Sequence, residues 1–376
     1  MDESGLDELG NLRRRIDRID RSLVDLLAER FHLAGEIGTA KRTEGQSVYD
    51  PNRERRVLAQ AMAAAGDRFP PERLQAIFRE IISASRSVES GHSVLVHGEL
   101  GGLAHEAAYR RFGSAIEIEV VSRAEDLLRR VDERRVDFGL VTLEGRSFEA
   151  SLDRLDLLLH TEVGISGEVH LQPRILAWSS AEQDEPDRAS PIFATPAILA
   201  RASRWLAAQT SEREVRATSS TEHAVRAAAE ARGLVLGHPV LESIFPLRPV
   251  STEVDDGREE WRRFFLLSRR QSEPTGRDKT TVLLFIPDRA GALHRVTGAL
   301  SRHEVNLCWL EPKATALGPW DHLFVLEMEG HREDPRLRET LAELEGEVEM
   351  LRVLGSYADE GPRSPSAGAV RAGGAP

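Results

Sequence analysis

The sequence predicts a multidomain protein in which an all-helical segment is followed by an α/β segment and then by a smaller α+β module. Three observations predict this class. Apolar residues recur every three or four positions across residues 6–90, which is the spacing of buried helix faces. From about residue 92 to residue 271, short apolar strands alternate with helices. Residues 280–357 then give a strand, a helix, two strands, a helix and a strand.

The length of 376 residues allows two or three domains, each with a core of its own. We place the domains at residues 1–90, 91–271 and 272–358. The remaining residues, 359–376, are rich in Gly, Pro, Ala and Ser, and we expect this tail to be disordered.

Composition and charge exclude several classes of partner. The net charge of -12 argues against a surface for nucleic acid or for an anionic membrane. The sequence has no run of 18 apolar residues, and its first residues lack the basic and apolar regions of a signal peptide. The single cysteine, Cys308, excludes an intramolecular disulfide. We therefore expect a cytoplasmic protein that binds neither membrane nor nucleic acid.

The first segment predicts three helices. A helix from about Leu6 to Arg42 would be roughly 55 Å long at 1.5 Å per residue. Such a helix is too long to bury its apolar face within a small monomer, so it should pair with another subunit. Asp50 and Pro51 suit the start of a second helix as its cap and its first turn. A pair of prolines ends that helix, and a third helix follows.

A cation interrupts the apolar seam of the first helix. Arg30 falls where the next apolar residue is due, between Leu26 and Leu33. Lys41 follows 11 residues later and shares the same helix face, so the gap between the two cations suits a small dianion. Arg13 points roughly 100° away and is better placed to serve a partner helix. An arginine in such a seam also serves as a register device or an ion pair, which is the alternative.

The other two helices add polar groups to this seam. Arg53 and Glu54 start the second helix, and Ser85 and Glu89 share one face of the third. The arrangement therefore predicts several cations, one hydroxyl and a carboxyl group, without metal ligands and without a nucleophile.

Residues 6–90 resemble the all-helical chorismate mutases that begin the bifunctional chorismate mutase/prephenate dehydratases. The resemblance lies in the motifs LRRRID, LLAER, GTAK, DPNRER and FREIISASRSVE. It implies conversion of chorismate to prephenate by a concerted rearrangement, with no metal and no cofactor, in a homodimer or a higher homo-oligomer with equivalent sites. The implied catalytic residues are Arg13, Arg30, Lys41, Arg53 and Glu89, and the implied substrate-binding residues are Asp50, Glu54 and Ser85.

The resemblance also implies how these residues act. Arg13 of one chain would complete the site of the other, and the remaining cations would bind the two carboxylates and the ether oxygen of chorismate. The family has either Gln or Glu at the position of Glu89, and only a protonated Glu can donate a hydrogen bond to the ether oxygen. We therefore expect mutase activity to fall as pH rises.

Residues 92–271 resemble the prephenate dehydratase domain, which has two α/β lobes like those of a periplasmic binding protein. The catalytic motifs differ from the family pattern. The differing positions are Gly102, Leu103, Ala104, Thr142, Leu143, Gly145, Arg146, Arg154, Ile175 and Arg262. Arg262 replaces the threonine that assists departure of the prephenate hydroxyl, and a guanidinium holds its proton too tightly to replace it as an acid. We therefore expect the dehydratase chemistry to be lost.

Residues 280–357 resemble an ACT domain, a βαββαβ module that binds amino acids. The resemblance implies phenylalanine as an effector, at Gly291, Ala292, Leu293, Asn306 and Glu311. Glycine at position 291 would let a ligand approach the start of a helix closely. A dimerisation module without a ligand is the alternative.

The sequence thus favours a chorismate mutase of phenylalanine biosynthesis whose following domains regulate or scaffold it. One alternative is a fully bifunctional enzyme that makes phenylpyruvate. Others are a second domain with altered prephenate chemistry or a purely sensory role, and a non-catalytic regulatory protein.

Overall fold

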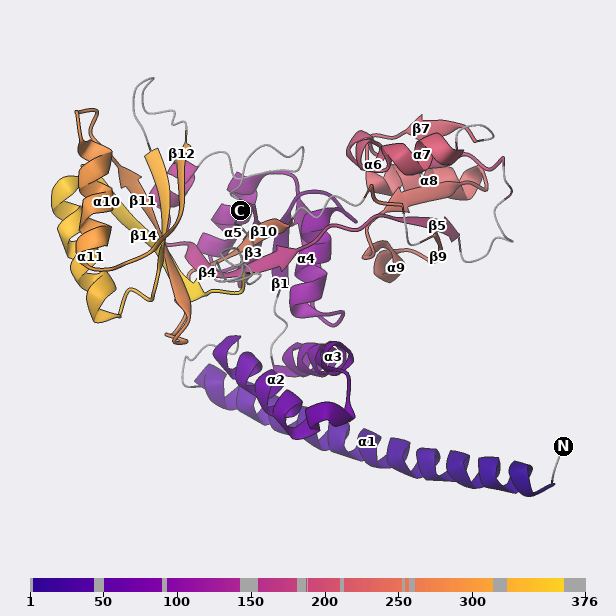
Figure 1. The fold of residues 1–376 in the computed structure, drawn as a ribbon. Helices are drawn as coiled ribbons and strands as arrows, with labels where there is room; N and C mark the ends of the chain where they lie inside the picture. Colours follow the sequence, from indigo (N-terminus) through magenta and orange to yellow (C-terminus); the bar gives the residue numbers. More distant parts are fainter. Residues whose placement is uncertain are drawn as a thin grey trace, which may run out of the picture. The chain divides into compact units, whose positions relative to one another are not determined.

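The computed structural model describes residues 3–43, 51–89, 93–142, 155–180, 187, 189–209, 213–251, 254–256, 261–313 and 323–361 (Figure 1). The chain divides into two compact units. These are Met1–His92 together with Phe112–Glu117, and Ser93–Arg111 together with Ile118–Pro376. No helix among the described residues combines the length and the apolar character needed to cross a membrane.

The described residues of the first unit form helices, as the sequence predicts. They are α1 (Glu3–Thr43), α2 (Pro51–Ala65), the short 3-10 turn η1 (Gly66–Arg68) and α3 (Pro71–Glu89). Both α2 and α3 begin at a proline, whose fixed φ suits the first turn and whose missing N–H would have no intrahelical partner there. The third helix packs against the other two. The expected cap, Asp50, lies outside the described residues.

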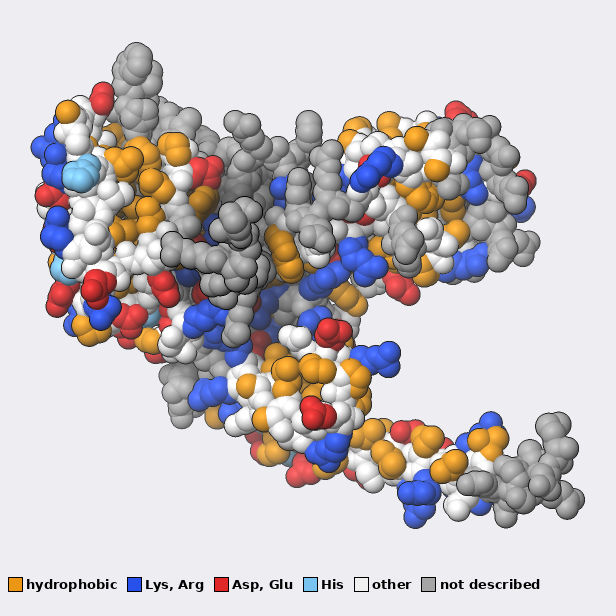
Figure 2. Space-filling view, in the orientation of Figure 1, with side chains coloured by type: hydrophobic (Ala, Val, Ile, Leu, Met, Phe, Trp, Pro, Cys, Tyr) orange, Lys and Arg blue, Asp and Glu red, His pale blue; other side chains and the backbone are white. Residues whose placement is uncertain are grey.

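The first unit buries little of its own apolar surface. Among its described apolar side chains in residues 3–89, only Ala34 and Ile82 are buried. An apolar stripe along α1 is 44–62% exposed, and consists of Leu9, Leu12, Ile16, Ile19, Leu23, Leu26, Leu33 and Ile37. Figure 2 shows hydrophobic side chains at the surface along this helix. A single chain therefore leaves uncovered the helix face that the sequence makes apolar.

The second unit contains two mixed sheets in its described part. The first has the order β2 (Glu117–Val121), β1 (Ser93–His97), β3 (Phe138–Val141), β10 (Arg262–Ser268) and β4 (Gly164–Leu171). Strands β1 and β3 are parallel, whereas β10 is antiparallel to both of its neighbours. The helical elements in this part of the chain are α4 (Leu103–Phe112), α5 (Ala124–Asp132) and η2 (Leu155–His160).

The second sheet lies between β4 and β10 in the chain. Its order is β7 (Val215–Ala217), β6 (Ile192–Ala194), β8 (Leu234–Gly237), β5 (Leu176–Ser180) and β9 (Leu247–Ser251). Its helices are α6 (Pro196–Arg201), α7 (Ser203–Gln209), α8 (Thr221–Glu230) and α9 (Leu241–Ile244). The chain thus leaves the first sheet after β4 and returns to it at β10. The two mixed sheets confirm the α/β class predicted for this segment.

The last part of the second unit has the predicted succession of strands and helices. The elements are β11 (Asp278–Phe285), α10 (Ala292–Arg302), β12 (Leu307–Lys313), β13 (Leu323–Glu329), α11 (Pro335–Glu347) and β14 (Met350–Ala358). The sheet order is β12-β13-β11-β14, and all its neighbours are antiparallel. Alternate residues such as Val282 and Leu284 pack under the two helices.

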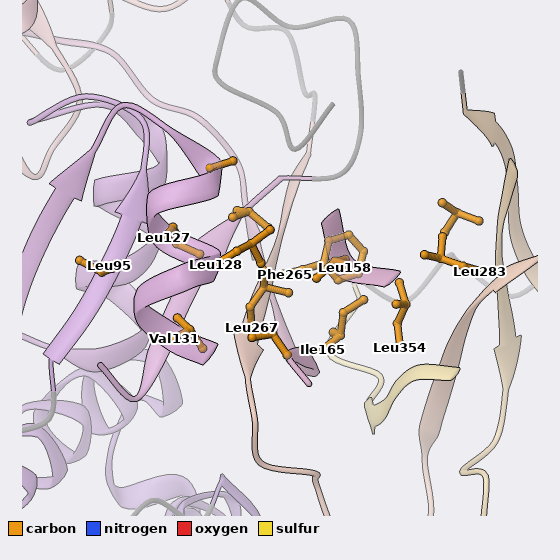
Figure 3. Packing of buried hydrophobic residues seen from close by; sticks show 14 of the residues in the cluster. Leu95, Leu127, Leu128, Val131, Leu158, Ile165, Phe265, Leu267, Leu283 and Leu354 are labelled. Atoms are coloured by element: carbon orange, nitrogen blue, oxygen red, sulfur yellow. The ribbon is translucent and has the colours of Figure 1, made fainter. Parts of the chain in front are cut away.

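The other face of this sheet shares a core with the first sheet. Phe265 and Leu267 of β10 belong to the same buried cluster as Ile165 of β4, Leu283 of β11 and Leu354 of β14 (Figure 3). The boundary predicted between residues 271 and 272 falls in the connection between β10 and β11. Because a common core includes residues from both sides, the described structure forms one unit there, and the boundary stays a prediction.

Buried charges join the same two sheets. The guanidinium of Arg263 on β10 lies 2.8 and 3.0 Å from the two carboxylate oxygens of Glu327 on β13. Glu168 of β4 is 1% exposed, and its oxygens lie 3.6 Å from Arg263 and 3.4 Å from Lys279 of β11. Burial alone would raise the pKa of Glu168, but a hydrogen bond from His170 and the charges of the two cations lower it. Glu168 is therefore held as a carboxylate, and neighbouring cations compensate its charge.

Candidate active site

A cavity of about 250 Å³ opens among the three helices of the first unit. Its lining combines apolar and charged side chains: Arg30, Leu33, Ala34, Ile37, Lys41, Arg53, Glu54, Val57, Ile82, Ser85 and Arg86. Four cations and one carboxylate thus face an otherwise mostly apolar space. Such a lining suits a small anionic ligand that also carries apolar surface.

The helix period brings these residues together. Arg30, Ala34, Ile37 and Lys41 follow one another on α1 at steps of three or four residues, so they lie on one face. The structure therefore places Arg30 and Lys41 in the same cavity, as their spacing suggests. The first turn of α2 contributes Arg53 from the opposite wall.

Arg30 is oriented by the third helix. Its Nη1 donates hydrogen bonds to the hydroxyl of Ser85 and to the carbonyl oxygen of Ile81, the latter at 3.3 Å. Ser85 is buried and donates in turn to the same carbonyl at 2.7 Å. Both acceptors are oxygens of the third helix, and these bonds fix the direction of the guanidinium at the cavity wall.

Glu54 has a partner that the sequence reasoning missed. Both nitrogens on one side of the Arg86 guanidinium, Nε and Nη2, contact the two oxygens of the Glu54 carboxylate. Arg86 is only 6% exposed, so this is a buried two-pronged ion pair. The sequence offered one indication that Arg86 is buried. It follows Ile82 by four residues, so the two side chains lie on the same face of the helix, and Ile82 is buried. The pair holds Glu54 at the cavity wall.

Three residues proposed for this site are not placed in the cavity. Asp50 lies outside the described residues, and Glu89 ends α3 with a side chain that is also outside them. Arg13 is exposed on α1 and does not line the cavity. It precedes Arg30 by 17 residues, which is about 25 Å along a helix. Within one chain, Arg13 therefore stays away from the other cations.

A second cavity of about 290 Å³ lies in the second unit and is lined from both mixed sheets. The lining residues are His97, Gly98, Glu99, Gly101, Gly102, Leu103, Ala104, Thr142, Thr195, Ala197, Ile198, Thr221, Gly237, His238 and Phe264. Four of the positions with altered motifs, Gly102, Leu103, Ala104 and Thr142, thus face this cavity. Arg262 and Ile175 are not among the lining residues. The altered positions Leu143, Gly145, Arg146 and Arg154 lie outside the described residues.

The protonation states in the second cavity are set by burial. Burial raises the pKa of Glu99, and a hydrogen bond from the backbone N–H of Thr221 only partly offsets this. Burial lowers the pKa of His238, whose Nδ1 donates to the carbonyl oxygen of Arg174 at 2.9 Å. His238 is therefore neutral at pH 7.

Across the described ranges, no group of three or more His, Cys, Asp or Glu residues is arranged to hold a metal ion.

The residues proposed for an effector are divided between two ends of the last sheet. Gly291 precedes α10 with φ of +78°, and Ala292 and Leu293 form the first turn of that helix. Because β11 and β12 both pair antiparallel with β13, Glu311 near the end of β12 lies at the same end of the sheet. Asn306 precedes β12 and lies at the opposite end of the sheet, about 16 Å from Glu311 at 3.3 Å per residue.

Comparison with known proteins covers nearly the whole chain. The family model for chorismate mutase type II matches residues 12–90, and the model for prephenate dehydratase matches residues 94–272. A bifunctional chorismate mutase/prephenate dehydratase of Aquifex aeolicus is 31% identical over 357 residues, which cover 94% of this chain and 98% of the relative. The corresponding protein of Stutzerimonas stutzeri is 28% identical over 362 residues, with coverage of 94% and 98%.

Solved structures show the fold of the second unit. The crystal structure of a prephenate dehydratase from Arthrobacter aurescens, in complex with L-Phe, superimposes with a TM-score of 0.62. The match is 22% identical in sequence and covers 71% of this chain and 90% of that chain.

Proposed function

The chain belongs to the family of bifunctional chorismate mutase/prephenate dehydratases, and on that premise we propose that its first unit converts chorismate to prephenate for phenylalanine biosynthesis. It is an enzyme in which a chorismate mutase domain is fused to a prephenate dehydratase domain. The observation that carries the proposal is the cavity in which Arg30, Lys41 and Arg53 meet over apolar side chains.

The rearrangement of chorismate is concerted, so it needs neither a nucleophile nor a metal. An enzyme accelerates it by holding the compact conformer and by stabilising negative charge on the breaking ether oxygen. Arg30, Lys41 and Arg53 bind the two carboxylates and this oxygen. Asp50 and Glu54 orient the substrate hydroxyl, and Ser85 also orients Arg30 through the hydrogen bond described above. Glu89 donates a hydrogen bond to the ether oxygen when it is protonated.

A homodimer completes this site. The exposed apolar stripe on α1 needs a cover, and a second copy of the same helix offers a complementary stripe. Pairing along α1 brings the partner's Arg13 to the cavity, where it becomes another cation for the substrate. The same pairing explains why Arg13 lies far from Arg30 within one chain.

The test is to measure chorismate consumption by the full-length chain and by the Arg30→Met variant. We expect the variant to lose at least about 10²-fold in kcat, because a cation aligned with the developing charge is removed. Arg73→Met is the control, since Arg73 is exposed on α3 outside the cavity. Equal rates for wild type and Arg30→Met, at normal helix content, would remove the cavity from the mechanism.

Prephenate made in the first unit is the natural ligand of the second cavity. Two observations support this: the prephenate dehydratase model matches this segment, and both mixed sheets contribute to the cavity. The altered motifs leave three fates for bound prephenate: dehydration with a different proton donor, altered decarboxylation, or binding alone.

The last module acts as an ACT domain that binds phenylalanine. Its strand and helix order supports this, as does the related dehydratase solved with L-Phe. Asn306 and Glu311 lie at opposite ends of β12, about 16 Å apart at 3.3 Å per residue, which is longer than a single amino acid, so we propose that the ligand lies between two copies of the module. Titration calorimetry of the full chain with phenylalanine tests the site, with Gly291→Val as the variant that should lose binding. As a biosynthetic enzyme, the protein would act in the cytoplasm.

A further inference from the structure

A loop of the first sheet reaches the second sheet's helix α8 beside the second cavity. Gly101, which follows β1 in this loop, has φ of +77°. A Cβ atom there would lie 2.5 Å from Leu241 Cδ2 and 2.9 Å from Thr221 Cγ2. Only glycine therefore allows this approach. The close contact places the carboxylate of Glu99 where it accepts a hydrogen bond from the N–H of Thr221.

Glu99 is the only carboxyl group among the described residues that line this cavity. Glu99 belongs to the first of the altered motifs, three residues before Gly102, but it is not one of the positions where the family's hydroxyl groups are missing. Glu99 is exposed, so its carboxyl group exchanges protons with solvent, and partial desolvation by the surrounding protein raises the pKa of that group. A raised pKa keeps part of the population protonated closer to neutral pH, as a general acid requires.

The cavity also has a polar group without a partner. Thr195 is 7% exposed, and its hydroxyl has no hydrogen-bond partner among the described residues. A buried unsatisfied hydroxyl is costly, so a ligand with polar groups fits this wall.

We propose that Glu99 is the general acid of the second cavity and protonates the hydroxyl group that leaves prephenate during dehydration. The inference rests on the proposal that this cavity binds prephenate. One carboxyl oxygen of Glu99 accepts the N–H of Thr221, which leaves the protonated oxygen for the substrate.

The step balances in atoms and charge. The C4–O bond of prephenate breaks, and the oxygen takes the proton of Glu99 and leaves as water. The bond between the ring and its carboxylate breaks at the same time, and its electron pair enters the ring, which becomes aromatic as carbon dioxide leaves. The Glu99 carboxylate then takes a proton from solvent.

Other titratable groups surround this acid. They are His97 of β1, His105 and Glu106 of α4, His238 after β8, and Glu222 and His223 of α8. Burial lowers the pKa of both His105 and His238, so neither carries an extra proton at neutral pH. Because the raised pKa of Glu99 governs the acid form, kcat should fall as pH rises through that pKa.

The experiment supplies prephenate to the full-length protein at and above pH 7 and measures phenylpyruvate after subtraction of the protein-free rate. We expect Glu99→Gln to lower kcat by about 10²-fold with little change in KM, to abolish the pH-dependent fall, and Glu99→Asp to be intermediate. Glu222→Gln is the matched control, because its carboxylate is exposed on α8 and pairs with Arg226.

Two results would overturn the inference. One is a Glu99→Gln variant with the wild-type rate and pH profile. The other is wild-type protein that makes no phenylpyruvate from prephenate. Chorismate consumption is measured on the same samples, so failure of the mutase proposal is recognised separately. Titration calorimetry with prephenate at a pH where it is stable shows separately whether the cavity binds its proposed ligand.

Discussion

Arg30 and Arg86 show how two arginines in one cavity take different roles. Arg86 contacts both oxygens of the Glu54 carboxylate through Nε and Nη2, and the pair is buried. Arg30 donates to a hydroxyl and a carbonyl oxygen on α3, which fix the direction of its guanidinium. Arg86 therefore fixes Glu54 in the wall of the cavity, and Arg30 is the arginine that we propose binds the ligand. The sequence alone does not distinguish the two arginines, whereas their contacts in the structure do.

Glu89 gives a testable prediction at the scale of a single residue. A carboxylate cannot donate a hydrogen bond to the ether oxygen of chorismate, whereas a carboxylic acid or an amide can. Mutase activity should therefore fall as pH rises, and Glu89→Gln should flatten this profile. The measurement is kcat/KM for chorismate between pH 5 and 9. A profile that the substitution leaves unchanged removes Glu89 from the mechanism.

At the scale of the element, the apolar stripe of α1 predicts the oligomeric state. Ile19 lies within the stripe, and an aspartate there would place a charge in the proposed interface. We expect Ile19→Asp to give a monomer with strongly reduced mutase activity, as judged by light scattering and chorismate consumption. Ala28→Asp is the control, because Ala28 is exposed on the opposite face of the helix. A dimeric, active Ile19→Asp variant would place the interface elsewhere.

The loop before α4 gives a second prediction for an element. Gly101→Ala would strain a positive φ and force a methyl group against Leu241 and Thr221. We expect this change to destabilise the second unit by about 2 kcal/mol and to weaken prephenate binding, with mutase activity retained. Gly276→Ala is the control, because Gly276 has φ of +85° and open space around its Cα.

Urea denaturation and titration calorimetry measure the two effects. The backbone strain is common to both variants, so the difference between them isolates the steric contact at Gly101. Equal stability and equal affinity would mean that the loop does not depend on this close approach.

At the scale of the whole molecule, buried charges and a common core tie the last module to the first mixed sheet. Arg263 and Phe264 are neighbours on β10. One joins the buried network with Glu327, and the other lines the second cavity. The strand therefore connects the module directly with the wall of the cavity.

Removal of Arg263 tests this connection. Arg263→Met would leave Glu327 and Glu168 buried with one cation fewer, and we expect a loss of about 3 kcal/mol in the stability of the second unit. Arg226→Met is the control, because Arg226 is exposed on α8 in a simple i,i+4 pair. Unfolding in urea, monitored by circular dichroism, compares the two. Similar midpoints would show that the network adds nothing to the stability of the second unit.

The sequence predicted elements well where periodicity was strong. The helix around Arg30 and the strand and helix order after residue 280 follow from apolar spacing alone. Strand β4 was harder to recognise, because its buried residues include Ser166 and Glu168, which look like surface residues in a sequence. Their burial depends on Arg263 and Lys279, which come from distant parts of the chain.

The candidate sites show the same difference between residues that one element brings together and residues that meet only in the folded protein. Steps of three and four residues brought Arg30 and Lys41 into one cavity, since both lie on one helix. The role that we propose for Glu99 could not be predicted from the sequence, because it depends on a close approach between the two mixed sheets that Gly101 permits. Sequence patterns find residues that one element brings together and miss those that meet only through the tertiary fold.

The central claim is that the first unit is a working chorismate mutase. The most direct test incubates full-length protein with chorismate at neutral pH and separates the products by chromatography, because chorismate and prephenate are isomers of equal mass. An acid step must be avoided, since acid alone converts prephenate to phenylpyruvate. The account predicts that chorismate disappears at a rate proportional to enzyme, that prephenate forms first, and that Arg30→Met largely prevents both. Chorismate that decays only at the rate seen in buffer would contradict it.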